Sequence, residues 1–413
     1  MPATQVAVPR ASAGTFTLLR NPSFFRLWLC GGLAGAMRWL EVLAIGIWSF
    51  EQTGSALLVA LMMVLRQMPM LLFGPFAGGL AERMSRRHLL LLGFLLQAAV
   101  AGSLSLSAWA GTLALWQVGL GALLSGIYTA LDMPVRRTMV AEVAGTERLS
   151  GAMGLDAATI HFTRAIGPTL GGIAYAFLGL GGAYAVTACC FLIAALAVWP
   201  LDAFPGRGEG ETFLRGVGEG LAYMRRQPIL IAILLVTVIE NFFGFPYASL
   251  APVLGREELE VGPVLVGLLA SADGIGGFAG SMCVAAIGPR RWQHRIYVLG
   301  ALAFFVALGA AALSSWYWLC FGALLIAGLG VAGFGTMQST LVMLSAPPAY
   351  RGRMMGLLTM SIGVAPLGIL HAGLLASSFK ASTAMGIMAA EGLAAIALVL
   401  LGFGAFRRRV MRG

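Results

Sequence analysis

The residues of this chain most able to do chemistry are charged side chains inside long apolar segments. Arg38 and Glu41 lie three positions apart in one such segment, and Glu240 lies in another. A charge at mid-bilayer depth costs about 3 kcal/mol on insertion scales, so it normally faces a polar interior or a transport path. We therefore predict that Glu41 and Glu240 bind a proton on such a path and that Arg38 tunes Glu41. Because Arg38 and Glu41 share a helix face, an intrahelical pair that hides both charges is the alternative.

Further charged or titratable residues in the apolar segments are assigned to the same path: Arg66, His161, Arg164 and Asp273. Arg66 and Asp273 occupy corresponding depths in two segments, where they either pair as a structural lock or line the path. His161 and Arg164 share a helix face, and a histidine can titrate near neutral pH.

Two other acids receive no role on the path. Asp156 lies near the start of an apolar segment, where capping of a helix N-terminus is the expected role. Glu391 has no obvious partner in the sequence.

Aromatic and amide side chains near these charges are candidates for the wall of a substrate cavity. The predicted set is Trp39, Asn241, Phe242 and Phe245, with Phe243, Tyr247 and some of the 20 methionines as further candidates. Methionine adapts its shape readily, which suits amphiphilic or varied substrates. For any one of these positions, contact with lipid or packing is the alternative.

The composition is that of a membrane protein. Hydrophobic residues make up 59% of the 413 residues and charged residues only 11%, and the mean hydropathy is +0.87. The 56 glycines favour close helix packing. The five cysteines show no metal-binding spacing, and neither a metal cluster nor a nucleotide-binding G-x-x-x-x-G-K-[ST] motif is evident. We expect neither an enzyme nor a bound cofactor.

Twelve segments have the roughly 20 apolar residues that a helix needs to cross a bilayer. They cover about 24–50, 55–80, 88–110, 112–133, 151–177, 181–201, 228–250, 262–287, 296–314, 316–343, 354–378 and 383–404. With the N-terminus inside, 22 of the 27 basic residues fall in cytoplasmic segments, which predicts that both termini are cytoplasmic. This bias accounts for the net charge of +10 by orientation and lipid contact, without nucleic-acid binding. No removable signal peptide is expected.

The segments divide into two sets of six. We predict a cytoplasmic tail at 1–23, a bundle at 24–201, a linker at 202–227 with an amphipathic surface helix, a second bundle at 228–404 and a basic tail at 405–413. Residues 59–61 leading to Arg66 can be laid over residues 266–268 leading to Asp273. Such an echo indicates parallel duplication of six helices around a central site. The predicted fold class is an all-α polytopic membrane protein with two pseudo-symmetric six-helix bundles.

The loop after the second segment, GGLAERMSRR at 78–87, resembles the G-x-x-x-D-R-x-G-R-R signature of the major facilitator superfamily, with Glu82 for Asp and Ser85 for Gly. The resemblance implies a cytoplasmic gate in which Glu82, Arg83 and Arg86 interact with Asp132, Arg136 or Arg137 when that side is closed. A plain solvated basic loop is the alternative.

Residues 164–172 resemble the G-P-x-x-G-G motif of antiporters in that superfamily, which implies export by exchange. Gly167, Pro168, Gly171 and Gly172 are then expected to kink and closely pack the fifth segment. The arginine that many drug antiporters carry in the fourth segment is missing, and Gln117 and Gly121 stand in that region.

Stretches at 18–28, 132–149, 219–228 and 351–356 narrow the resemblance to the branch with the enterobactin exporter and macrolide efflux proteins. It implies proton-driven export of a siderophore- or drug-like compound by alternating access at a bacterial cytoplasmic membrane. The expected partners are the substrate, protons and lipid. The alternatives are a facilitator or importer, and a lipid-handling or scaffold protein on the same fold.

Overall fold

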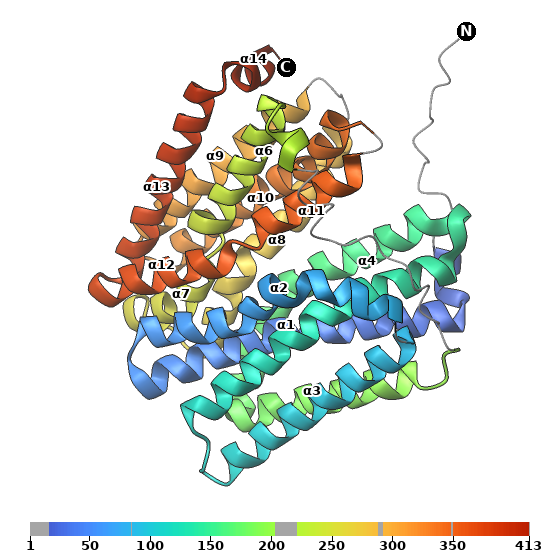
Figure 1. Ribbon diagram of the computed structural model, residues 1–413. Helices are drawn as coiled ribbons and strands as arrows, with labels where there is room; N and C mark the ends of the chain where they lie inside the picture. The colour runs from blue at the N-terminus through green and yellow to red at the C-terminus, as the bar shows by residue number, and fades with distance from the viewer. Residues whose placement is uncertain (1–15, 84, 203–220, 288–291, 348–349, 413) are drawn as a thin grey trace.

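The computed structural model describes residues 16–83, 85–202, 221–287, 292–347 and 350–412, and every regular element in them is helical (Figure 1). Among these residues, ten helical stretches are long and apolar enough to cross a membrane, and Ala56–Met70 is a shorter apolar helix. The stretch Ala158–Val198 has 41 residues. A straight helix of that length would extend about 60 Å, twice the thickness of a bilayer core. It therefore contains two spans, and the predicted all-α polytopic fold is confirmed.

The N-terminal half contains a short 3₁₀ turn and four helices: η1 (Phe16–Arg20), α1 (Pro22–Thr53), α2 (Ala56–Arg83), α3 (Arg86–Trp109) and α4 (Leu115–Val198). The side chain of Asn21 accepts hydrogen bonds from the N–H groups of Ser23 and Phe24, which starts α1. Inside α4 the chain turns at Gly145 (φ 71°) and Gly179 (φ 64°). Only glycine adopts these left-handed conformations without strain, so the two glycines divide α4 into three spans.

The C-terminal half begins with a composite span in which α-helix alternates with π-helical turns. The composite span consists of α6 (Pro228–Ile239), η2 (Glu240–Gly244), α7 (Tyr247–Val253) and η3 (Leu254–Glu258). The rest of the C-terminal half consists of α8 (Pro263–Ile287), α9 (Gln293–Ala312), α10 (Tyr317–Ser345), α11 (Arg351–Ile362), α12 (Ala365–Ser378), α13 (Ala381–Gly402) and α14 (Gly404–Arg412). The predicted basic tail is thus largely helical. Most of the predicted linker, residues 203–220, lies outside the described residues.

Each half has its own apolar core. One core joins buried residues between positions 18 and 201, and the other joins buried residues between 230 and 410. Apolar side chains also join the halves. Ala56 and Val59 of α2 belong to the second core, Ile369 of α12 belongs to the first, and Leu43 and Ile47 of α1 form a separate small cluster with Val266 of α8. The halves are therefore packed bodies that share an apolar interface.

The two halves meet at one end of the spans, which we call the Gly54 end; the opposite end is the α14 end. Figure 1 shows α12 and α7 beside α1 and α2 at the left, with the halves diverging toward the upper right. A side chain added at Gly172 would strike the backbone of Pro263, and one at Gly373 would strike Ala60. Glycine at these positions lets the halves approach closely at the Gly54 end.

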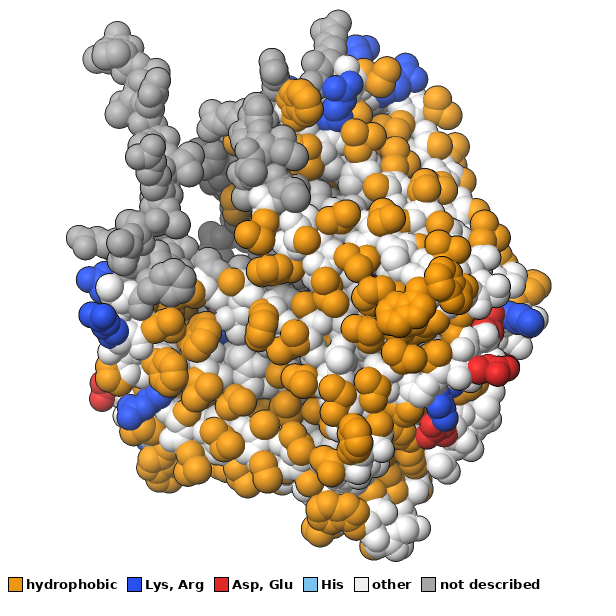
Figure 2. All heavy atoms as spheres, turned by 180° about the vertical axis from the view of Figure 1, so that it is seen from behind, with side chains coloured by type: hydrophobic (Ala, Val, Ile, Leu, Met, Phe, Trp, Pro, Cys, Tyr) orange, Lys and Arg blue, Asp and Glu red, His pale blue; other side chains and the backbone are white. Residues whose placement is uncertain are grey.

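The surface matches a bilayer environment. Figure 2 shows hydrophobic side chains covering one face between groups of charged residues at its margins. Five tryptophans at span ends are more than half exposed: Trp109, Trp116, Trp199, Trp316 and Trp318. Indole rings at such positions are typical of the membrane–water interface.

Candidate functional site

A cavity of about 550 Å³ lies next to the interface between the halves. That volume is within the range of small-molecule sites. All but one of its described lining residues come from the C-terminal half. The lining is Arg164, Asn241, Phe245, Asp273, Gly274, Gly277, Ser281, Val331, Ala332, Phe334, Gly335, Thr336, Gln338, Ser339, Thr340 and Ile362.

The N-terminal half contributes Arg164 of α4, whose guanidinium forms an ion pair with Asp273 of α8. Arg164 Nη2 lies 2.5 Å from Asp273 Oδ2. The guanidinium carbon lies 5.7 Å from the ring centroid of Trp39 and 5.5 Å from that of Phe245. Two aromatic rings at these distances hold the cation by cation–π attraction. The pair therefore joins the two halves at the wall of the cavity.

This pairing corrects one prediction, because Asp273 pairs with Arg164 and not with Arg66. A second polar contact lies nearby: the N–H of Thr169 donates to Ser271 Oγ at 3.1 Å, and the two hydroxyl oxygens are 2.9 Å apart. At Gly274, an added Cβ would lie only 2.8 Å from the carbonyl oxygen of Arg164. The α4–α8 contact thus combines an ion pair, hydroxyl hydrogen bonds and close backbone approach.

The glycines of the predicted kink motif serve close packing of α4. An added Cβ at Gly171 would lie 2.9 Å from the Cα of Leu40, and one at Gly167 would strike the side chain of Trp39. Gly172 faces Pro263 of the other half, and the backbone of Pro168 faces Gly267. The non-helical dihedrals inside α4 occur at Gly145 and Gly179, so residues 167–172 keep helical angles.

The other predicted intramembrane pair is also different from the expectation. Glu41 Oε2 binds Arg66 Nη1 of α2 at 2.8 Å, and both side chains are buried, with 4% and 7% exposed. The intrahelical Arg38–Glu41 alternative is therefore wrong. Arg38 is half-buried, and its guanidinium is attracted by Asp132 and repelled by Arg66. The Glu41–Arg66 pair lies wholly inside the N-terminal half.

Glu240 does not line the cavity, contrary to the prediction. It is fully buried, and neither of its carboxyl oxygens has a hydrogen-bond partner within the described structure. It begins the π-helical turn η2, and its Oε2 lies beside Gly244 in the core, where Phe304 also packs. The next residue, Asn241, lines the cavity, because successive helical residues are rotated by about 100° and so face different surroundings.

Of the aromatic residues predicted to line the cavity, only Phe245 is among its described lining residues. Phe242 instead stacks on His371 with centroids 5.6 Å apart. Trp39 contacts Arg164 and borders a separate cavity of about 30 Å³ together with Pro168 and Pro252. Helix rotation, which the sequence does not specify, decides which of these rings faces the cavity.

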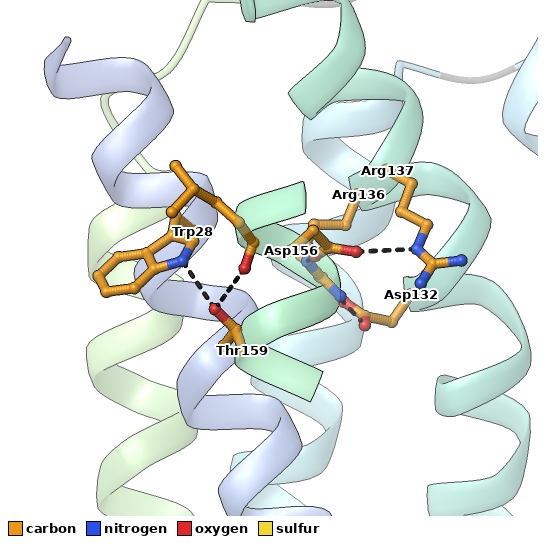
Figure 3. Close-up of polar contacts among 7 residues, drawn as sticks. Trp28, Asp132, Arg136, Arg137, Asp156 and Thr159 are labelled. Atoms are coloured by element: carbon orange, nitrogen blue, oxygen red, sulfur yellow. Dashed lines mark hydrogen bonds and ion pairs between the residues drawn. The ribbon is translucent and has the colours of Figure 1, made fainter. Parts of the chain in front are cut away.

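Three of the predicted gate residues, Asp132, Arg136 and Arg137, form a charge cluster with Asp156 at the α14 end (Figure 3). Asp156 receives hydrogen bonds from Arg136 Nη1 at 2.6 Å and Arg137 Nε at 2.9 Å. Arg136 also lies 3.5 Å from Asp132, one turn earlier on the same helix. Asp156 thus pairs with arginines inside α4 and is not a helix cap. Figure 3 also shows Trp28 of α1 donating to Thr159 at 2.8 Å, which ties α1 to this region.

Arg86 is buried, and its ion pair is with Glu142 at 2.5 Å, not with Asp132, Arg136 or Arg137. The side chains of Glu82, Arg83 and His161 lie outside the described residues. Of the predicted contacts of the signature loop, the described residues therefore test only that of Arg86, which binds Glu142 of α4.

The sequence prediction missed three further contacts. His371 Nε2 lies 2.8 Å from Glu391 Oε2, which gives Glu391 the partner that the sequence did not reveal. At the Gly54 end, Arg256 pairs with Glu51 at 2.9 Å across the halves, and Tyr175 donates a hydrogen bond to the same carboxylate. Arg256 lies between the predicted spans 228–250 and 262–287, outside the cytoplasmic segments that hold 22 of the 27 basic residues, and that exception was the available signal.

Comparisons with known proteins identify the family and the fold of this chain. The family model described as "Transmembrane secretion effector" matches residues 13–407. Macrolide efflux protein A of Streptococcus pyogenes is 23% identical over 86% of this chain and 89% of its own. Multidrug efflux pump Tap of Mycolicibacterium fortuitum is 25% identical over 84% of this chain and 87% of its own. A bacterial homologue of the human lysosomal transporter Spinster, solved in an inward-facing and unoccupied conformation, superposes with a TM-score of 0.72 at 16% identity, covering 95% and 98% of the two chains.

Proposed function

Because this chain belongs to the transmembrane secretion effector family of major facilitator transporters, we propose that it exports a small amphiphilic organic compound in exchange for protons. The membrane is the bacterial cytoplasmic membrane, with both termini on the cytoplasmic side, as the distribution of arginines favours. The proton gradient is the driving force, and no cofactor is needed.

The observation that carries the proposal is a cavity whose wall contains an ion pair joining the two halves. Around it, the cross-half contacts of the described residues lie in the middle of the spans and at the Gly54 end: Arg164–Asp273, Thr169–Ser271, Gly172–Pro263, Ala60–Gly373 and Glu51–Arg256. Ser281 and Thr340 line the part of the cavity nearer the α14 end. This arrangement supports an inward-facing state of an alternating-access cycle.

In this scheme the acids at the interface respond to protons. After the Gly54 end has separated and the substrate has left, Asp273 would take up a proton from outside, which removes one charge of the Arg164–Asp273 pair. The protonated protein would return to the inward-facing state, and proton release to the cytoplasm would restore the pair. One proton would then move inward for each substrate exported.

Glu41 is a second coupling candidate, since its protonation would free Arg66 and leave the two cations Arg66 and Arg38 near each other. Glu240 is a weaker candidate than the sequence indicated, because it lies in a core without contact to the cavity.

The test is substrate-evoked proton movement in proteoliposomes that contain an internal pH-sensitive dye. A panel of siderophores, macrolides and cationic dyes is applied to wild type, Glu41→Gln, Asp273→Asn and Glu240→Gln. We expect coupled substrate and proton flux in wild type and loss of coupling in Asp273→Asn or Glu41→Gln. Glu240→Gln should retain the coupling and is the matched control, because Glu240 is a buried acid away from the cavity.

Other outcomes contradict the proposal in distinct ways. Substrate flux without proton movement indicates a facilitator, and net accumulation driven inward indicates an importer. Absence of flux across the panel, with folded protein, favours the lipid-handling or scaffold alternative.

A further inference from the structure

We propose that the transported compound carries an anionic oxygen group, such as a carboxylate, that Arg164 binds in the cavity. The inference rests on the proposed transport function and specifies its substrate class. The described cavity lining contains two charged side chains, Arg164 and Asp273, so these two decide which charge a substrate meets.

The cation is the accessible member of the pair. The Arg164 side chain is 27% exposed, whereas the Asp273 side chain is only 5% exposed. A cationic substrate would have to displace the guanidinium to reach the carboxylate behind it. An anionic substrate can approach Arg164 directly from the cavity.

The guanidinium also has donors left for a ligand. It carries five N–H groups, and the hydrogen bond described for it uses Nη2 toward Asp273. Trp39 and Phe245 lie near the guanidinium and limit its movement. A held guanidinium with free N–H groups suits a carboxylate, which can accept two parallel hydrogen bonds from it.

The rest of the cavity suits an amphiphile around such a group. Ser281, Ser339 and Thr340 supply hydroxyl groups, and Phe245 and Phe334 supply apolar surface. An anion placed in this cavity meets one accessible cation, neutral hydrogen-bonding groups and aromatic rings. A cationic amine would find one nearly buried acid already bonded to arginine.

Anion binding would also act on the transport cycle. A substrate carboxylate competes with Asp273 for Arg164, and the Arg164–Asp273 pair is one of the contacts that hold α4 against α8. A ligand that binds better when this pair is loosened shifts the population toward the state in which the halves separate there. Substrate recognition and outward opening would then depend on the same arginine.

The experiment measures equilibrium binding of three fluorescent probes with one fluorophore and different charge: dansylglycine, its methyl ester and dansylcadaverine. Purified full-length protein in nanodiscs is excited at tryptophan. Because the chain has nine tryptophans, the part of the energy transfer to the dansyl group that Trp39→Phe removes reports binding beside Arg164. We expect dansylglycine to bind at least about tenfold more tightly than the ester or the amine, the difference that one charge-assisted hydrogen bond supplies.

Two variants test the residue assignment. Arg164→Gln should abolish the preference for the carboxylate probe. Asp273→Asn should strengthen dansylglycine binding several-fold, because the competing carboxylate is gone, and a gain of binding cannot come from misfolding. Arg256→Gln is the control, since it removes an arginine from another cross-half pair outside the cavity lining.

Dansylglycine binding no tighter than that of the ester, including undetectable binding of both, overturns the proposal. So does tighter binding of dansylcadaverine that Asp273→Asn abolishes, which would assign a cationic substrate to the acid. These results leave the proposed export function standing if coupled flux is observed for a neutral or cationic compound. Conversely, a carboxylate preference without proton-coupled flux would support the site and contradict the antiport.

Discussion

Removal of the Glu41 charge should destabilise the N-terminal half far more than removal of both charges of its pair. Glu41 and Arg66 are 4% and 7% exposed and 2.8 Å apart, so the relevant magnitude is that of a buried pair. Breaking a buried pair by removing one partner costs about 3–5 kcal/mol, because the remaining charge is buried without compensation. An exposed pair would contribute only about 0–1 kcal/mol.

Arg38 lies near this pair, where Asp132 attracts it and Arg66 repels it. Loss of the Glu41 carboxylate leaves the buried Arg66 without its partner. The double variant Glu41→Gln/Arg66→Met removes the carboxylate and one of the cations, and it replaces Arg66 by an apolar side chain of similar length. Such replacements of buried ion pairs are often neutral or stabilising.

The assay is a double-mutant cycle on the folded fraction that remains after heating, read by gel filtration in detergent. We expect Glu41→Gln and Arg66→Met each to lose folded protein well below the wild-type temperature, and the double variant to recover most of the loss. A Glu41→Gln protein as stable as wild type would refute the reasoning. It would mean that water reaches Arg66 and that the pair is not buried in solution.

Three further outcomes follow from the contacts. Gly274→Ala places a methyl group against the Arg164 backbone, and this overpacking should disfavour the closed Gly54 end about tenfold, measured as cysteine accessibility from outside. Gly277→Ala is the control and should leave that accessibility unchanged, because its methyl group meets only ordinary contacts. Arg256→Gln should change stability by about 0–1 kcal/mol, because this pair is a third exposed, with the difference shrinking at high salt in thermal denaturation. Asp156→Asn should cost about 2–3 kcal/mol by weakening two charge-assisted hydrogen bonds in the charge cluster, and equal stability to wild type in the same heating assay would contradict that role.

The spans were predictable because hydropathy and length report directly on the bilayer. The identity of the partners within them was not. Arg38 and Glu41 satisfy the i,i+3 rule, yet Glu41 turns toward α2, because helix–helix packing determines which face meets a neighbour. The same limit explains why Asp273 was paired with the wrong arginine. The position of each residue within its apolar segment indicated that Arg66 and Asp273 share a level in the membrane. It did not indicate the direction in which each side chain faces about the helix axis.

Glu240 shows a second limit. Its position in span seven favoured a role on the path, and its neighbour Asn241 does line the cavity. The π-helical turn η2 alters the register of the helix by a fraction of a turn, and no residue pattern in 240–244 announces it. The glycine motif at 167–172 was informative in another way, since small residues there indicate close packing whatever the direction of the helix.

The two intramembrane ion pairs have different consequences because one is inside a half and the other crosses between halves. Alternating access moves the halves as bodies, so Glu41–Arg66 can persist through the cycle while Arg164–Asp273 must lengthen when α4 and α8 separate. Conservative replacement of the second pair should therefore appear mainly in transport, whereas replacement of the first should lower stability in addition to any loss of proton coupling. Because the Arg164–Asp273 pair must break in every cycle, a substrate group that competes for one of its members helps to break it. Arg164 is more exposed than Asp273, so an anionic substrate can compete for Arg164.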